Sequence, residues 1–395
     1  MRRSTDRILT THVGSLPRPD DLLEVNRAKL TGEGFDPSLY GARLKASVAG
    51  ICRRQAELGI AVINDGEYGK ASIGAIDYGP WMSYAWGRLG GWEYSTPAPG
   101  VRPMLATRRD RLMFADFYKE FDGTGFISSS SLAPRPPVFA GPITYAGQAA
   151  VRADLENLKA GLAGLSVAEV FVTSVAPGTF SIVQNRYYKT EEEFQFALAE
   201  AMREEYKAII DAGFVLQLDD PGLPSHWDAT NPQPSLDDYN KGAVMRVEAL
   251  NHALRGLPQD RIRYHMCWGS WHGPHVTDIP LRDVVALMLR VNAGAYSIEA
   301  ANARHEHEWK VWHDVKLPEG KILIPGVVSH ATNVIEHPEL VADRILRFAS
   351  VLGRENIIAG TDCGLGGRIH QQLVWAKLQA LAEGAALASR ELWRQ

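Results

Sequence analysis

The amino-acid sequence predicts a single (β/α)8 barrel with an insertion after its second strand. Short apolar runs alternate with long amphipathic ones, eight of the short runs can be counted as strands, and most are followed by a helical pattern. A doubly wound parallel sheet is the rival architecture, but it usually carries a glycine-rich phosphate-binding turn. The nearest sequence to such a turn is Gly364-Leu365-Gly366-Gly367, which lacks the G-x-G-x-x-G spacing.

The eight predicted strands are short β-prone runs that end at polar or glycine-containing turns. In chain order they are Ile8–Val13, Ile60–Asn64, Phe171–Val175, Phe214–Leu218, the run from Arg263 to Cys267, Ala295–Ile298, Ile322–Val327 and Ile357–Ala359.

The predicted helices show apolar residues at intervals of three and four. The first illustrates the pattern, because Leu44, Val48, Ile51 and Cys52 share one face, which makes Cys52 a core residue. The predicted helices are Tyr40–Leu58, Glu191–Asp211, Asp237–Leu257, Asp278–Val291, Glu336–Leu352 and a final one at about 371–392.

Residues 80–140 interrupt the alternation. We interpret them as an inserted aromatic and arginine-rich segment of one catalytic domain spanning 1–395, because the apolar content is aromatic and scattered. Its characteristic residues are Trp81, Tyr84, Trp86, Trp92, Tyr94, Arg102, Arg108 and Arg109.

Length and composition limit the function. The chain has 395 residues, 45% hydrophobic and 22% charged, which is typical of globular proteins. A net charge of −4 offers no basic surface to nucleic acid or an anionic membrane, and no apolar stretch suits a membrane span or a signal peptide. Three cysteines are too few for a disulfide framework. We therefore expect a soluble cytoplasmic protein that acts on small molecules, with a homo-oligomer left open.

Two potential metal ligands stand two residues apart at the end of a predicted strand. His265 and Cys267 therefore point to the same side, although alone they fit a core histidine beside a buried cysteine better than a metal site. Glu299 closes the next strand and Cys363 the last, and the strand ends of a barrel meet at one mouth. One imidazole, two thiolates and one carboxylate can fill four positions around Zn²⁺, so the sequence predicts a zinc site of these four residues.

A thiolate-rich zinc site can bind a substrate thiol and lower its pKa, so that the sulfur reacts as a thiolate at neutral pH. Ser15, Glu67 and Asp219 also end predicted strands and suit a polar, amino-acid-like thiol. Each has a structural alternative, since Ser15 can complete a turn and Asp219 can cap a helix.

Other polar and aromatic residues have two interpretations each. Trp268 and Trp271 fit substrate contact and ordinary core or rim positions equally well. The run from His305 to Glu308 can be a second metal site, but a solvated start of a helix explains it better. His330 fits a hydrogen-bonded loop histidine nearly as well as a catalytic one.

Seven short motifs, in the same order, resemble those of the cobalamin-independent methionine synthases, from about residue 8 to 370. They are Thr10-Thr11-His12-Val13-Gly14-Ser15-Leu16-Pro17 (T-T-x-x-G-S-F-P), Asp65-Gly66-Glu67 (H-G-E), Gly141-Pro142-Ile143-Thr144 (G-P-V-T), Gln217-Leu218-Asp219-Asp220-Pro221 (Q-I-D-E-P), His265-Met266-Cys267 (H-M-C), Ser297-Ile298-Glu299 (S/T-I-E) and Asp362-Cys363-Gly364-Leu365 (D-C-G-L).

The resemblance implies a barrel of the methionine synthase and uroporphyrinogen decarboxylase-like type, with zinc on the four proposed ligands. It implies that Ser15, Glu67 and Asp219 hold homocysteine, and that His330 assists proton movement near the methyl donor. The reaction implied is methyl transfer to homocysteine in methionine biosynthesis, as in a 5-methyltetrahydropteroyltriglutamate–homocysteine S-methyltransferase. We therefore expect His330 and Asp219 to act in catalysis, and Ser15, Glu67, Asp219 and Trp268 to contact substrate.

The chain departs from this family in ways that leave the donor open. It has the length of the catalytic barrel alone, and Tyr145 stands where the family places a pterin-binding tryptophan. The donor is thus a folate, a methylated corrinoid protein or an epoxide. An epoxyalkane:coenzyme M transferase-like reaction on another thiol is the first alternative. A decarboxylase or lyase that uses no zinc on the same barrel, and a thiol-binding or zinc-storing protein without turnover, are the others.

Overall fold

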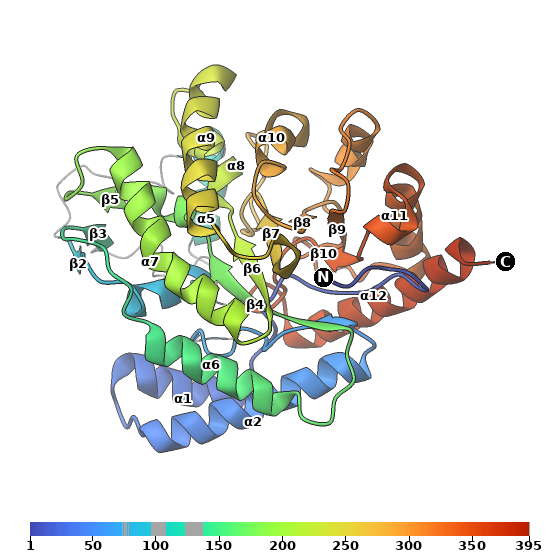
Figure 1. The fold of residues 1–395 in the computed structure, drawn as a ribbon, viewed down its shortest axis with the longest axis horizontal. Helices are drawn as coiled ribbons and strands as arrows, with labels where there is room; N and C mark the ends of the chain where they lie inside the picture. The colour runs from blue at the N-terminus through green and yellow to red at the C-terminus, as the bar shows by residue number, and fades with distance from the viewer. Residues whose placement is uncertain (73, 75–76, 78, 96–107, 123–136, 395) are drawn as a thin grey trace.

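The computed structural model describes residues 1–72, 74, 77, 79–95, 108–122 and 137–394, and its strands form a curved parallel sheet surrounded by helices (Figure 1). The main sheet has seven strands in the order β1-β4-β6-β7-β8-β9-β10, and every neighbouring pair is parallel. These strands are β1 (Val62–Ile63), β4 (Glu169–Val175), β6 (Val215–Asp219), β7 (Ile262–Met266), β8 (Ala295–Ile298), β9 (Ile322–Val328) and β10 (Gly360–Thr361).

The N-terminal segment joins the two edges of this sheet. Thr10 forms a parallel bridge with Ala359, next to β10. On its other side the carbonyl oxygen of Thr10 accepts hydrogen bonds from the backbone N–H groups of Ala61 and Val62, at 3.1 and 2.9 Å. The segment predicted as the first strand thus makes only a bridge, yet it occupies the eighth position of the ring. The predicted (β/α)8 barrel is confirmed.

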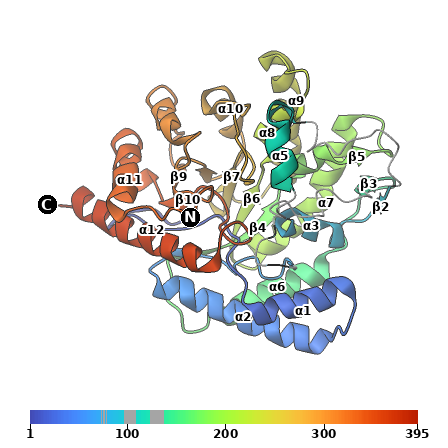
Figure 2. The ribbon, with the colours of Figure 1, turned by 180° about the vertical axis from the view of Figure 1, so that it is seen from behind.

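Twelve α-helices occur in the described residues, and most cover the outside of the sheet (Figures 1 and 2). In both views α1, α2 and α6 lie together along one edge, and α11 packs against α12 on another. The helices are α1 (Asp20–Thr31), α2 (Pro37–Glu57), α3 (Pro80–Ser83), α4 (Arg109–Met113), α5 (Ala115–Asp122), α6 (Gln148–Gly161), α7 (Glu191–Asp211), α8 (Gly222–Ala229), α9 (Leu236–Ala253), α10 (Leu281–Met288), α11 (Pro338–Leu352) and α12 (Gln371–Leu392).

Local sequence explains where several helices begin and end. Thr190 caps α7 by accepting a hydrogen bond from the backbone N–H of Glu193, whose carboxylate accepts one from the N–H of Lys189. The prediction for α10 was too long, because Pro280 occupies the N-cap in an extended conformation and the helix starts after it. The prediction for α9 was also too long, since the chain turns at Gly256 with φ of +73°. Helices α1, α3, α4, α5, α6 and α8 were not predicted.

The described part of residues 80–140, the predicted insertion, packs against the barrel. It contains α3, α4, α5, the 3₁₀ turn η1 (Tyr84–Gly87) and strands β2 (Trp92–Tyr94) and β3 (Pro137–Phe139), which form a small sheet with β5 (Gln184–Asn185). Side chains join it to α7, since the buried Arg88 and the half-buried Tyr84 both donate hydrogen bonds to the Glu205 carboxylate, at 2.8 and 3.0 Å. Arg102 lies outside the described residues. Among the described residues, no helix is long and apolar enough to cross a membrane.

Candidate metal centre

Three of the four proposed ligands meet where their strands end. His265 lies in β7, Cys267 directly follows it, and Cys363 follows β10. Each of the three offers one potential ligand atom, and these atoms all lie within 4.8 Å of one another. The three side chains are 1%, 4% and 5% exposed. Barrel closure therefore brings together residues that are almost one hundred positions apart in the sequence.

The two thiols of this cluster have opposite pKa shifts. The pKa of Cys363 is held well below its usual value, because its sulfur accepts a hydrogen bond from Cys267 and because Arg368 is near, whereas the same contact and burial raise the pKa of Cys267 well above its usual value. His265 Nδ1 is 3.2 Å from Ser297 Oγ, while its Nε2 is buried and makes no hydrogen bond within the described residues. A buried nitrogen without a partner is costly unless it binds something. Two sulfur atoms and one imidazole fit zinc.

Glu299, the fourth proposed ligand, lies in an adjoining cluster. It follows β8, and its Oε1 accepts a hydrogen bond of 2.9 Å from the backbone N–H of Trp268. Its Oε2 accepts one of 2.7 Å from the amide of Asn302. Its ligand atom groups within 4.8 Å with those of His330 and Asp362, while the cysteines form the other group. Burial raises its pKa well above the usual range. Its role as a ligand stays a prediction.

Asp362, in the D-C-G-L motif, is a buried residue for which the sequence predicts no role. Its Oδ1 accepts hydrogen bonds from the backbone N–H groups of Ala300 and Ala301, at 2.7 and 2.8 Å. Because these residues follow Glu299, the hydrogen bonds of Asp362 connect the end of β10 to the end of β8. The signal in the sequence was an acid directly before a strand-end cysteine.

His330 lies directly beside this centre. It is 2% exposed and lies in a loop after β9, near Cys363 and Arg368. Burial lowers its pKa to about 3, so the imidazole is neutral at neutral pH. Its Nδ1 is buried with no hydrogen-bond partner among the described residues. A neutral imidazole with an unused nitrogen can accept or donate one proton, but a catalytic role stays a prediction.

The predicted substrate residues are buried around the same mouth. Ser15 Oγ donates a hydrogen bond of 3.1 Å to the carbonyl of Gly366. Asp219, at the end of β6, accepts one of 2.7 Å from the Gln217 amide, and burial raises its pKa to about 7. Glu67 follows β1 and has a φ of +61°, which is unusual for a residue with a side chain.

Trp268 has a clear structural role. It is 1% exposed, and its indole N–H donates a hydrogen bond of 2.7 Å to the carbonyl of Ile279. Its ring stacks on the imidazole of His305, with ring centres 3.8 Å apart. Because its backbone N–H binds Glu299, this packing fixes the position of that carboxylate. Substrate contact by Trp268 stays a prediction.

The histidines near residue 305 form an ion-pair network. His305 Nδ1 is 2.8 Å from Glu308 Oε2, and its Nε2 is 3.2 Å from Asp278 Oδ2. His275 binds the same carboxylate at 2.9 Å. Both nitrogens of His305 are therefore used, and the two candidate metal groups of the described residues do not include it. This arrangement favours a structural role over a second metal site.

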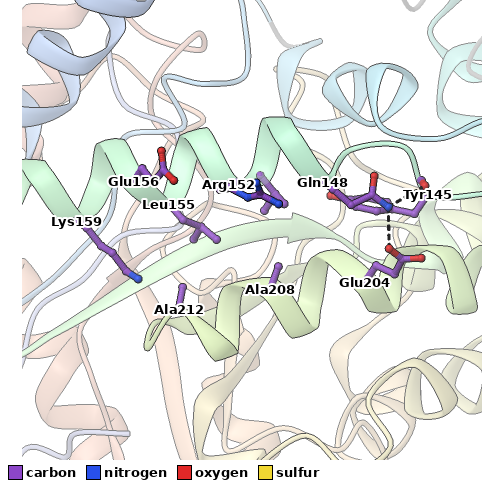
Figure 3. Close-up of a pocket in the computed structure, with 10 residues that line it drawn as sticks. Tyr145, Gln148, Arg152, Leu155, Glu156, Lys159, Glu204, Ala208 and Ala212 are labelled. Carbon is purple, nitrogen blue, oxygen red and sulfur yellow. Dashed lines mark hydrogen bonds between the residues drawn. The ribbon is translucent and has the colours of Figure 1, made fainter.

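A separate hollow lies on the surface between α6 and α7 (Figure 3). Its volume is about 330 Å³, and a hydrogen bond of 2.8 Å from Gln148 to Glu204 crosses one end. Apolar and mixed-charge side chains line it, among them Leu155, Ala208 and Lys159. None of the predicted site residues lines it, so it lies outside the candidate centre.

The fold and these side chains define a class: (β/α)8 barrels with a cluster of buried histidine and cysteine side chains at the ends of their strands. A family described as the catalytic domain of cobalamin-independent synthases matches residues 115–386. The chain belongs to this family.

Relatives resemble the whole chain. A protein named methionine synthase from Saccharolobus solfataricus is 23% identical over 390 residues, covering 98% of this chain and 96% of the relative. A 5-methyltetrahydropteroyltriglutamate–homocysteine methyltransferase from Thermotoga petrophila is 22% identical, covering 92% of this chain and 42% of the relative. The structure of a B12-independent methionine synthase from Shewanella sp. W3-18-1 has a TM-score of 0.72 at 20% identity, covering 98% and 99% of the two chains. This last match shows a shared fold.

Proposed function

We propose that this chain is a zinc-dependent methyltransferase that methylates the sulfur of homocysteine to give methionine. The observation that carries the proposal is the convergence of His265, Cys267 and Cys363 within 4.8 Å at the ends of their strands. The names of the relatives support methyl transfer to homocysteine as the reaction. The domain proposed for this activity spans 1–395, with residues 80–140 as its insertion.

These residues would hold Zn²⁺, with Glu299 as the proposed fourth ligand. When bound, zinc would supply a site at which a thiol loses its proton near neutral pH. To turn its carboxylate toward the cysteines, Glu299 would have to break its hydrogen bonds with Trp268 N–H and Asn302. We therefore propose that Glu299 is the ligand that can bind to and dissociate from the metal, while the other three stay bound.

The other residues are proposed to orient the two substrates. Asp219 would hold the ammonium group of homocysteine, and Ser15 would contact its polar end. The substrate sulfur forms a bond to the methyl carbon, while the bond from that carbon to the donor breaks and its electron pair leaves with the donor. His330, a neutral imidazole buried beside the centre, would take up the proton that the homocysteine thiol releases and transfer a proton to the leaving group.

The first test combines metal content with turnover. Cys363→Ser removes one proposed ligand, so we expect at least a tenfold loss of bound zinc and of methyl transfer to homocysteine. Cys52→Ala is the matched control. Cys52 is buried on α2, outside the cluster, so this variant should bind as much zinc as the wild-type protein. Metal analysis and mass spectrometry, with methyl-folate, methylcobalamin and an epoxide as donors, give the result. Full zinc in Cys363→Ser would remove that ligand assignment.

A further inference from the structure

The two cysteines of the candidate centre lie in loops that are far apart in the sequence. Cys267 directly follows β7, and Cys363 lies in the loop after β10. Arg368 reaches from the second loop to the first, because its Nε donates a hydrogen bond of 2.6 Å to the Oγ of Ser270. Both side chains are buried. This contact therefore joins the two loops three residues after one cysteine and five residues after the other.

The loop after β7 is attached to its neighbours at alternate residues. The backbone N–H of Trp268 donates a hydrogen bond of 2.9 Å to Glu299, which follows β8. The Nε2 of His272 lies 3.0 Å from the carbonyl oxygen of His330, which follows β9. Ser270 lies between these two positions and supplies the side-chain contact to the loop of Cys363. The position of Cys267 is therefore determined by three neighbouring strand ends.

The loop of Cys363 is fixed on its other side. The Nη1 of Arg368 donates a hydrogen bond of 3.1 Å to the carbonyl of Gly366, which also accepts one of 3.1 Å from the Ser15 hydroxyl. The carbonyl of Ser15 accepts hydrogen bonds from the backbone N–H groups of Leu365 and Gly366, at 3.1 and 2.8 Å. A Cβ at Gly366 would clash with the backbone of Leu16, so the two segments are closely packed. The guanidinium that binds Ser270 thus extends from a well-supported loop.

Arg368 contributes a charge as well as a contact. Its positive charge acts on three groups of the mouth, the Cys363 thiol, the Glu67 carboxyl and the His330 imidazole. A substitution at Ser270 removes the contact and leaves this charge in the protein, whereas a substitution at Arg368 removes both. The two contributions can therefore be measured separately.

We infer that Arg368 is a positioning residue that holds the Cys267 and Cys363 loops together through Ser270. The inference rests on the proposed zinc centre. A hydrogen bond from a guanidinium to a buried hydroxyl is charge-assisted, and its loss leaves a buried donor without its acceptor. The loops then separate more easily, so any agent that must bind both sulfur atoms at once loses affinity.

The test compares two agents that need both sulfur atoms. The affinity for zinc is measured by competition with a chelator. Phenylarsine oxide, which forms two As–S bonds with a pair of thiols and releases water, is titrated into reduced, metal-free protein. Every protein in the comparison carries Cys52→Ala, so that Cys267 and Cys363 are the only thiols.

Ser270→Ala keeps the charge of Arg368 but removes its acceptor, so the affinity for both agents should fall about tenfold. Ser270→Thr keeps the hydroxyl and should stay within about twofold of the parent protein. In an Arg368→Met background, the further change Ser270→Ala should cost no more than about twofold, because the contact is already lost. Circular dichroism checks the fold, and Ser270→Gly serves in the same comparison if Ser270→Ala folds poorly.

Two outcomes would overturn the inference. One is an undiminished affinity of Ser270→Ala for either agent that the parent protein binds. The other is a tenfold loss from Ser270→Ala in the Arg368→Met background, which would show that Ser270 acts without Arg368. Failure of the proposed function is distinct. A parent protein that binds no zinc would contradict the zinc centre, while the titration with phenylarsine oxide still tests the contact between Arg368 and Ser270.

Discussion

At the scale of single residues, burial determines what each side chain at the mouth can do. His330 and Asp219 are both buried, but burial keeps the imidazole of His330 neutral and raises the pKa of the Asp219 carboxyl to about 7. Glu67 is equally buried, yet Lys70 and Thr173 hold its pKa below the usual value despite the desolvation. Two acids that look alike in the sequence therefore have pKa values shifted in opposite directions.

Asp219→Asn tests the assignment of the ammonium group. The amide oxygen of asparagine still accepts a hydrogen bond from the ammonium but carries no negative charge, so kcat/KM for homocysteine should fall at least tenfold, corresponding to about 1.5–3 kcal/mol. The value for the amine-free 4-mercaptobutanoate should change by no more than about twofold. Asp237→Asn, at an exposed site on α9, is the control. Equal losses with both thiols would point to another role for Asp219.

At the scale of elements, the centre depends on how closely neighbouring strands approach. Gly326 in β9 lies against the backbone of Asp362, the residue before Cys363. A Cβ on Gly326 would lie 2.6 Å from Asp362 Cα and 2.7 Å from its backbone nitrogen. Since Asp362 also binds the backbone after Glu299, a shift here would move two proposed ligands together.

Gly326→Ala should therefore lower both stability and metal affinity. The added methyl group meets backbone, which no rotamer change can relieve, so we expect a loss of about 3 kcal/mol in unfolding free energy. The affinity for zinc, measured by competition with a chelator, should fall at least tenfold, because the displacement of Asp362 also moves Cys363. Gly50→Ala, on an open face of α2, is the control and should be neutral or slightly stabilising. Wild-type zinc affinity in Gly326→Ala would show that the β9–β10 contact does not position Cys363.

At the scale of the whole molecule, the barrel closes through a segment that has little regular structure of its own. Arg263, buried in β7, reaches across the barrel interior to this segment. Its guanidinium donates hydrogen bonds to Thr11 Oγ1 at 3.0 Å and to the carbonyl of His12 at 2.7 Å, and lies 3.9 Å from the ring centre of Phe171. The closure of the barrel is therefore stabilised by side-chain hydrogen bonds in its interior as well as by backbone pairing of the N-terminal segment.

Arg263→Met should destabilise the fold by about 2 kcal/mol, because it leaves the buried His12 carbonyl without its strongest donor. Denaturant unfolding measures this loss. The control is Arg290→Met, which removes an exposed ion pair with Glu248 of 3.5 Å and should change stability by no more than about 0.5 kcal/mol. A fully stable Arg263→Met variant would show that backbone pairing alone closes the barrel.

The sequence predicted the fold and the meeting point of the ligands because both follow from regular patterns. The two-residue period of a strand predicted that His265 and Cys267 point to the same side. The ends of the strands of a (β/α)8 barrel meet at one mouth, which predicted that Cys363 lies near them. Helix α6 was missed although Val151, Leu155 and Leu158 show helical spacing. The ion pair between Lys70 and Glu67 could not be predicted, because it depends on how the two side chains are oriented. The sequence shows only that the two residues are three positions apart.

The central claim is that sulfur and nitrogen from distant strands bind one zinc ion at the mouth of this barrel. Zinc-edge X-ray absorption on purified, chelator-free protein tests it most directly, together with elemental analysis. We expect about one zinc per chain, with two sulfur neighbours at about 2.3 Å and nitrogen or oxygen neighbours at about 2.0–2.2 Å. Well-folded protein that takes up no zinc, or zinc without sulfur neighbours, would contradict the account.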